Sequence, residues 1–228
     1  MTLFENLEKQ YSKEQFSARE AQYLAHIYSW GPVVFQVARL MIKYGIYEML
    51  GESKTGLTRQ EICEKTGLSD YAVKCLLESA LTMHTILVNP SSDTYVLSKT
   101  GWFLLHDQMI RADIDFNHDV NYEGWFLLDK ALEEGKPTGL KHFGDWPTIY
   151  EGLSSLPAQV QKSWFGFDHY YSDHSFDEAL DIIRANQTKT LLDIGGNTGR
   201  FALRCVQHNP DIEVTICDLP QQIGLMKE

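Results

Sequence analysis

The sequence is short of cysteine and of positive charge. It has four cysteines in 228 residues, and they are too scattered to form a Cys-x-x-Cys pair or to meet histidines at zinc-ligand spacing. This argues against a disulfide framework, and we predict no metal site. Against 31 aspartates and glutamates stand 20 lysines and arginines, a net charge of −11 that repels phosphate backbones. Nucleic acid is therefore not an expected partner. The cysteines are Cys63, Cys75, Cys205 and Cys217.

Long apolar runs are also missing. No uninterrupted apolar stretch reaches the length that crosses a bilayer, and Met1 to Gln22 is polar and charged, unlike the apolar core of a signal peptide. We therefore expect no membrane partner and a cytoplasmic protein. With 43% hydrophobic and 22% charged residues, the chain has the composition of a globular protein with one large core or two smaller ones.

The first part of the chain has the element order of a winged helix. Pro32 suits the first position of a helix, and we predict one apolar helix from Val33 to Leu50, which is a candidate interface helix. The stretch from Thr58 to Glu61 is a capping box that opens a short helix, and Gly67 closes it. Ser69 is placed to cap the next helix. The apolar residues of that helix follow helical spacing: Val73, Leu76, Leu77, Ala80 and Leu81.

A β-hairpin and a further helix complete this pattern. Ile86 to Val88 and Thr94 to Leu97 flank a turn, and Ser98 is positioned to cap a helix that contains Trp102 and Phe103. A winged helix that reads DNA carries basic and amide side chains on the exposed face of its second helix. The charges nearly cancel on this one, so DNA binding is not the favoured use. The residues of that face are Asp70, Lys74, Glu78 and His84.

The most informative motif lies near the C-terminus. From Leu191 to Gly199, a short apolar strand runs into a glycine-rich turn and then a helix, and Val214 to Asp218 puts a carboxylate at the end of a second apolar strand. Glycine permits positive φ and a close approach of a ligand to the backbone. A carboxylate at the second strand end can accept hydrogen bonds from both hydroxyls of a ribose. The pattern predicts half of a nucleotide-type cofactor site.

The spacing of the glycines argues against a dinucleotide. A dinucleotide fingerprint has glycine at its first, third and sixth positions, and counted from Gly195 these positions hold Gly195, Asn197 and Arg200. Asp193, just before the first glycine, would repel a pyrophosphate but suits a ligand with a cationic end. S-adenosylmethionine, which carries a sulfonium and an ammonium group, fits such a site.

The run from Leu192 to Gly199, followed by Asp218-Leu219-Pro220, resembles the S-adenosylmethionine-dependent O-methyltransferases of the caffeate and hydroxyindole type. The Asp-Leu-Pro ending is the more specific part, because glycine-rich turns recur in many α/β folds. The resemblance implies S-adenosylmethionine as cofactor and a homodimer formed by the N-terminal domain. The implied cofactor-binding residues are Asp193, Gly195, Gly196, Gly199, Asp218 and Leu219.

The resemblance also implies a division into three parts. Residues 1–109 form a mainly α, winged-helix dimerisation domain, residues 110–187 a helical connector, and residues 188–228 the start of an α/β, Rossmann-like methyltransferase domain. In the family the connector lines the acceptor pocket, whereas core packing is the ordinary role of its many aromatic rings. We read His169 and His174 as helix-surface or capping residues. The candidate substrate-binding residues are Trp164, Phe167, Asp168, Tyr170 and Tyr171.

The chain stops soon after the second strand of the glycine motif, although a doubly wound sheet usually has about five or more parallel strands. We therefore expect a truncated methyltransferase domain whose strands expose apolar side chains. The family places the histidine that deprotonates the acceptor beyond Glu228, so no catalytic residue is assigned and the 228-residue chain is expected to be inactive. The side chains expected at exposed strand flanks are Leu191, Leu192, Val214 and Ile216.

Methyl transfer to the hydroxyl of a small aromatic, phenolic acceptor is the function that we favour, with oxygen as nucleophile on the resemblance alone. Two alternatives stay open. One is a winged-helix transcriptional regulator that senses a small aromatic ligand through the connector, and the other is an interaction protein that keeps the dimer scaffold without catalysis. The sequence identifies neither the acceptor nor the catalytic base.

Overall fold

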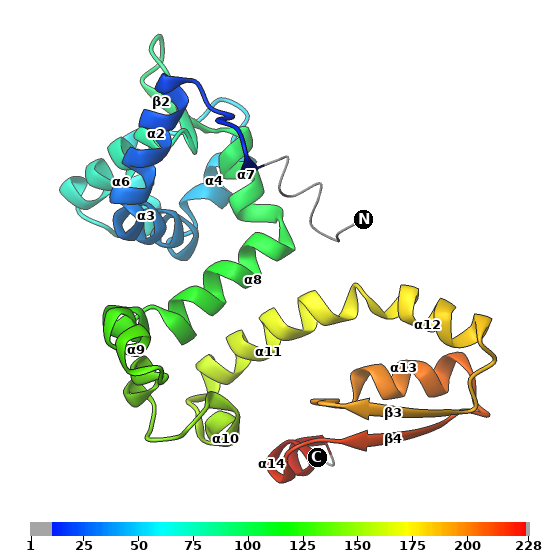
Figure 1. The fold of residues 1–228 in the computed structure, drawn as a ribbon. Helices are drawn as coiled ribbons and strands as arrows, with labels where there is room; N and C mark the ends of the chain where they lie inside the picture. The colour runs from blue at the N-terminus through cyan, green and yellow to red at the C-terminus, as the bar shows by residue number, and fades with distance from the viewer. Residues whose placement is uncertain (1–10, 227–228) are drawn as a thin grey trace. The chain divides into compact units, whose positions relative to one another are not determined.

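The computed structural model of the protein describes residues 11–226, apart from the side chain of Leu225 (Figure 1). The chain divides into two compact units, the first ending at His106 and the second beginning at Asp107. Within the described residues, no helix combines the length and the apolar composition needed to cross a membrane. All four cysteines are free thiols.

The first unit consists of helices with a β-hairpin, and from Arg59 onwards its elements occur in the order that the sequence predicts. The hairpin strands pair antiparallel, from Ile86 opposite Leu97 to Asn89 opposite Thr94. The elements of this unit are α2 (Ala18–Ser29), α3 (Gly31–Lys43), α4 (Ile46–Glu52), α5 (Arg59–Thr66), α6 (Asp70–Thr82), β1 (Ile86–Asn89), β2 (Thr94–Leu97) and α7 (Lys99–His106).

Local signals in the sequence set the ends of these helices. The Thr58 side chain accepts a hydrogen bond from the Glu61 backbone N–H, and the Glu61 carboxylate accepts one from the Thr58 N–H, so the capping box of α5 is complete. Gly67 ends α5 with φ at 71°. Ser69 caps α6, and the Ser98 hydroxyl accepts from the Gly101 N–H at the start of α7.

The predicted helix from Val33 to Leu50 is wrong in its middle. The chain forms α3 and α4 instead, separated by Gly45, whose φ of 66° lies in the left-handed region that ends a helix. Most of the apolar residues in this stretch are not free to form an interface, because they fill the core of the first unit. The core is built from Val37, Met41, Ile46, Tyr47, Leu50, Ile62, Val73, Leu76, Leu77, Ala80 and Ile86.

The second unit begins with a helical region, as predicted for the connector. Its first core joins Val120, Leu153, Leu156 and Val160, with the rings of Phe116, Phe143, Trp146 and Trp164 packed around them. The helices are α8 (Gln108–Phe116), the π-helix η1 (Asn117–Asn121), η2 (Gly124–Leu127), α9 (Leu128–Glu134), η3 (Thr138–His142), α10 (Ile149–Gly152), η4 (Leu153–Ser155), α11 (Ala158–Asp173) and α12 (Phe176–Ala185).

The α/β part of the second unit follows α12. It contains β3 (Thr190–Ile194), α13 (Arg200–His208), β4 (Glu213–Cys217) and α14 (Pro220–Met226). The two strands pair in parallel, from Thr190 opposite Glu213 to Ile194 opposite Cys217. Strand, glycine turn, helix and second parallel strand therefore occur in the predicted order, which is the opening of a Rossmann-like domain.

The two faces of the β3–β4 sheet differ in burial. Leu191 and Val214 point to a small core around Leu180, Cys205 and Ile212, which lie on or beside α12 and α13. On the opposite face, Leu192 is 58% exposed and Ile194 is 77% exposed. The expectation of exposed flanks was therefore right for Leu192 but not for Leu191, Val214 and Ile216, which are all half-buried. Leu191 and Val214 pack against the core formed with α12 and α13.

Candidate functional site

The parallel pairing of β3 and β4 brings the two parts of the glycine motif to one edge of the sheet. The Gly195 N–H donates to the Cys217 carbonyl over 2.8 Å, which fixes the start of the turn beside the end of β4. Gly195 and Gly199 both have φ at 76°, where a residue with a Cβ is strained. The sequence needs glycine at these two positions to turn from β3 into α13.

Asp218 holds this turn in place. Its Oδ2 accepts a hydrogen bond from the Asn197 backbone N–H over 2.7 Å, and its Oδ1 accepts one from the Leu219 N–H over 2.7 Å. Asn197 itself has φ at 50°. Since a carboxylate oxygen can accept more than one hydrogen bond, Asp218 retains free lone pairs for a ligand.

Asp193 lies in the same place without a partner. Its Oδ2 is buried and has no hydrogen-bond partner among residues 11–226. Burial, together with the negative charge of Asp218, raises the pKa of the Asp193 carboxyl. A Cβ on Gly196 would lie 2.8 Å from Asp193 Oδ2 and 2.7 Å from Ile216 Cγ2, so a larger residue would fill this space. The arrangement suits a cationic or hydrogen-donating ligand group.

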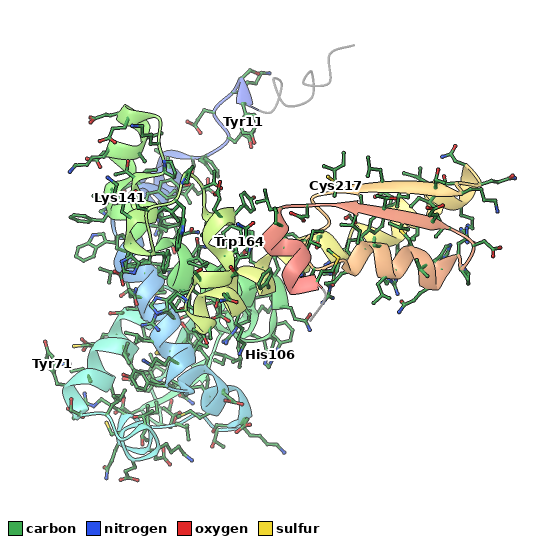
Figure 2. All side chains as sticks on the ribbon, turned by 90° about the horizontal axis from the view of Figure 1, so that it is seen from below. Tyr11, Tyr71, His106, Lys141, Trp164 and Cys217 are labelled. Atoms are coloured by element: carbon green, nitrogen blue, oxygen red, sulfur yellow. The ribbon has the colours of Figure 1, made fainter. Side chains whose placement is uncertain are left out.

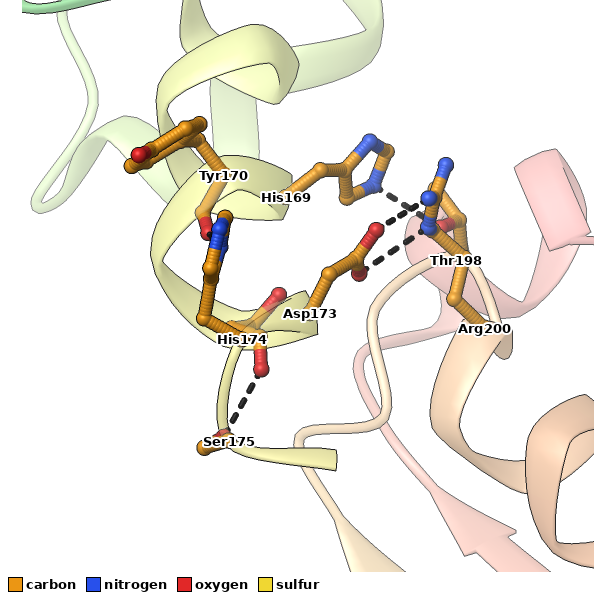
Figure 3. A network of polar contacts seen from close by, with 8 residues as sticks. His169, Tyr170, Asp173, His174, Ser175, Thr198 and Arg200 are labelled. Atoms are coloured by element: carbon orange, nitrogen blue, oxygen red, sulfur yellow. Dashed lines mark hydrogen bonds and ion pairs between the residues drawn. The ribbon is translucent and has the colours of Figure 1, made fainter. Parts of the chain in front are cut away.

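Three polar links, which we call the α11 clamp, join α11 to the glycine turn and the start of α13. The Asn197 amide donates to Asp168 Oδ2, His169 Nε2 lies 3.1 Å from Thr198 Oγ1, and Arg200 Nε donates to Asp173 Oδ1 over 3.2 Å. Figure 3 shows the last two links side by side. The clamp therefore holds the turn in addition to the hydrogen bond from Asn197 to Asp218.

His169 therefore has a role that differs from the surface or capping position expected from the sequence. Burial and the positive charge of Arg200 lower the pKa of this imidazole, and the carboxylates of Asp168 and Asp173 raise it to a smaller extent. His174 agrees with the expected capping position, because it is the C-cap residue of α11 and its Nδ1 lies 2.5 Å from the Tyr170 carbonyl.

These residues surround a cavity of about 480 Å³ within the second unit. Aromatic side chains from α10, α11, α12 and α13 form part of its wall, and the strand ends and the glycine turn form the polar part. The lining residues are Tyr150, Leu153, Trp164, Asp168, His169, Ser172, Ser175, Phe176, Ala179, Asp193, Gly195, Gly196, Asn197, Thr198, Arg200, Phe201, Asp218 and Gln222.

Most of the predicted cofactor-binding residues meet at this cavity. Asp193, Gly195, Gly196 and Asp218 line it. Gly199 does not: its missing side chain makes room for Met226, whose sulfur would lie 3.0 Å from a Cβ at this position. Leu219 is 40% exposed and is not in the lining.

Of the five predicted substrate-binding residues, two line the cavity and three make their contacts elsewhere. Trp164, labelled in Figure 2, and Asp168 are one helical turn apart and line the cavity. Phe167 stacks on Phe116 with the ring centroids 4.1 Å apart, and the Tyr171 hydroxyl donates to Asp113 Oδ1 over 3.0 Å. The Tyr170 ring packs on His174, with the centroids 4.4 Å apart.

Sequence reasoning missed several polar residues of the wall. Thr198 lies within the glycine motif but was not predicted as a site residue, whereas Arg200 and Gln222 belong to no recognisable motif and reach the wall through the packing of α11 and α14 near the turn. Asn197 Oδ1 and both amide atoms of Gln222 are buried and unpaired within the described chain. Among residues 11–226, no group of three or more histidine, cysteine or acidic side chains is arranged to hold a metal ion.

Comparison with known proteins identifies relatives of this arrangement. Residues 22–95 match the model of the Dimerisation2-like domain. The chain is 26% identical over 203 residues to L-tyrosine C(3)-methyltransferase of Streptomyces lavendulae, covering 87% of this chain and 54% of that protein. It is 22% identical over 210 residues to acetylserotonin O-methyltransferase of Bos taurus, covering 88% and 59%. The chain is a relative of the acetylserotonin-type O-methyltransferases.

Solved structures of methyltransferases share its fold. The structure titled PigF with SAH matches with a TM-score of 0.70 at 18% identity, over 93% of this chain and 62% of that one. Human N-acetylserotonin methyltransferase in complex with SAM matches with a TM-score of 0.62 at 18% identity, over 95% and 63%. The chain thus spans a little over half the length of these methyltransferases: a mainly helical dimerisation domain and part of a methyltransferase domain. The family and fold predicted from the glycine motif are confirmed.

Proposed function

We propose that the cavity binds S-adenosylmethionine. The Oδ2 atom of Asp193 carries this proposal, because it is buried without a hydrogen-bond partner and a ligand that supplies one relieves this cost. In this assignment Asp193 and the turn glycines Gly195 and Gly196 hold the amino-acid end, and Asp218 holds the ribose. Gly199 shapes the turn, and Leu219, which does not line the cavity, contributes through its backbone N–H, which donates to Asp218 Oδ1.

We further propose that the protein takes part in methylation of a small aromatic, phenolic acceptor. When bound, the donor supplies an electrophilic methyl group. The chain's own contribution is to orient the donor through Asp193 and Asp218 and to place Trp164 and Asp168 where an acceptor ring can lie. We propose Phe167, Tyr170 and Tyr171 as support for this wall, since they do not line the cavity and pack against α8 and the end of α11.

The nucleophile is the less constrained part of the proposal. The relatives include one protein named for methylation of tyrosine at carbon and others named for methylation of oxygen. We propose oxygen because the glycine and Asp-Leu-Pro motifs match the O-methyltransferase pattern. The proposed donor site is common to both kinds of reaction, so its test does not depend on this choice.

The transcriptional-regulator alternative finds no support on α6, the second helix of the winged helix. Asp70 Oδ1 lies 2.8 Å from Arg59 Nε, and Lys74 Nζ lies 3.8 Å from Glu78 Oε1. The positive charges near this face are therefore paired with carboxylates of the same unit. Such a surface attracts phosphates weakly.

We propose that the first unit forms a homodimer through α2 and the beginning of α3. α2 has no buried residue in the single chain, yet it presents large rings to solvent: Tyr23 is 46%, Tyr28 75% and the adjoining Trp30 61% exposed. The match of this region to the Dimerisation2-like domain supports a second copy of the chain as the partner.

Isothermal titration calorimetry with S-adenosylhomocysteine tests the donor site, on the 228-residue chain and on the complete product of its gene. Binding heat with one site per chain is expected for the complete product. Absence of binding there would refute the proposed function. Light scattering after size exclusion tests the dimer, which Tyr28→Ser is expected to weaken and Tyr11→Ser, at an exposed position outside α2, is not.

A further inference from the structure

Gln222 is a buried amide without a partner in the wall of the cavity. Its side chain is 3% exposed, and neither Nε2 nor Oε1 has a hydrogen-bond partner among residues 11–226. It belongs to α14, which packs against η4, and it lines the cavity together with Leu153, Asp193 and Asp218. An amide buried in this way has lost its hydrogen bonds to water, so a ligand that supplies new ones gains affinity.

The amide differs in kind from the other unpaired atoms of this wall. Asp193 Oδ2 and Asn197 Oδ1 are acceptors, whereas a glutamine presents an N–H donor and a carbonyl acceptor side by side in one plane. The matching ligand group must therefore carry a donor beside an acceptor. In an adenosyl donor, the amino-acid end is charged and the ribose hydroxyls suit a carboxylate. The adenine edge, with its 6-amino group beside a ring nitrogen, has the required pattern and pairs with glutamine through two hydrogen bonds.

The position of Gln222 in the chain supports the same pairing. It lies in the first turn of α14, directly after the Asp218 segment that we assign to the ribose. The base is bonded to the ribose, so a residue one turn beyond Asp218 is within reach of it. We propose that Gln222 recognises the adenine edge of the donor and so selects adenosine over other nucleosides. This inference rests on the proposed function of the cavity.

The test combines one substitution with one change in the ligand. Calorimetry measures the binding of S-adenosylhomocysteine, and of its analogue without the 6-amino group, to the complete protein, to Gln222→Leu and to Gln221→Leu. Gln221 is the exposed neighbour and serves as the matched control. Loss of the amino group is expected to weaken binding to the unmodified protein about 10-fold, and Gln222→Leu to weaken S-adenosylhomocysteine binding by a similar factor. In Gln222→Leu the amino group should no longer matter.

The outcomes distinguish failure of the adenine assignment from failure of the proposed donor site. If the amino group contributes equally in the unmodified protein and in Gln222→Leu, the adenine assignment is overturned, although the donor site stands. If the unmodified protein binds no S-adenosylhomocysteine, the proposed function fails, and the assignment fails with it. Should circular dichroism show Gln222→Leu unfolded, Gln222→Met replaces it in the same cycle.

Discussion

Replacement of Asp193 by asparagine should weaken ligand binding and, at the same time, make the folded protein more stable. The buried Oδ2 has no partner in the described part of the chain. Asparagine carries no charge, so the substitution removes both the cost of burying a charge and the repulsion from Asp218. We expect Asp193→Asn to raise the free energy of unfolding at neutral pH by less than about 1 kcal/mol, because solvent screens the charge of this half-buried residue. A charge-assisted hydrogen bond to the donor is lost, worth roughly 1.5–3 kcal/mol, or about 10- to 150-fold in Kd.

The pH dependence gives an independent check on the same residue. Because the pKa of Asp193 is raised in the folded state, the folded protein binds this proton more tightly than the unfolded chain. The contribution is therefore favourable below the ordinary aspartate pKa and is lost as pH rises through the raised value. Urea unfolding at a series of acidic pH values should show this slope in the unmodified protein and lack it in Asp193→Asn.

The control for these measurements is Asp211→Asn, at an exposed position in the same unit, which should change neither ligand affinity nor stability by more than about 0.5 kcal/mol. Calorimetry with S-adenosylhomocysteine supplies the affinities. The reasoning is refuted if Asp193→Asn binds the ligand as tightly as the unmodified protein and unfolds more easily, since Asp193 would then be a structural residue.

Three further substitutions probe the fold around these features. Gly196→Ala places a Cβ 2.7 Å from Ile216 Cγ2 and should cost about 1–3 kcal/mol in urea unfolding, whereas Gly224→Ala, where the space is open, should cost nothing. The Tyr47 hydroxyl is buried without a partner of normal geometry among the described residues, and burial raises its pKa to about 12. The free energy of unfolding should therefore fall as pH rises from the ordinary tyrosine pKa towards that value. Tyr47→Phe should remove this fall without loss of stability at neutral pH. Thr58→Ala removes the capping box of α5 and should lower stability by about 1 kcal/mol in thermal unfolding, and a change within error would contradict its role.

The elements that could be predicted are those whose cause is local in the sequence. Thr58 and Ser69 cap helices through bonds to N–H groups three residues away, so their signal lies within a few positions. The break at Gly45 was missed because apolar residues continue on both sides of it. A single glycine within an apolar run does not predict that the folded chain adopts the left-handed conformation seen at Gly45.

The part of the site that could be predicted from the sequence is likewise the part with a local cause. Asp193, Gly195 and Asp218 belong to a strand, a turn and a strand end that are adjacent once two strands pair in parallel, so pattern alone brought them together. Helical periodicity could not separate Trp164 and Asp168 from Phe167, because residues three and four positions apart share one face of a helix. Their separation depends on α8, where Phe116 stacks on Phe167. His169 and Gln222 could not be found, since their place in the wall depends on how α11 and α14 pack against the turn.

The α11 clamp has a consequence for how this protein can change over generations. Two of its links join positions 29 residues apart and the third joins positions 27 residues apart, so no local pattern records that they are partners. Loss of Asp168 would remove the acceptor of the part-buried Asn197 amide, whereas loss of Asp173 would leave Arg200, whose side chain is 50% exposed, to water. Homologues that lack Asp168 are therefore expected to carry a compensating residue at position 197, and homologues that lack Asp173 need none at position 200.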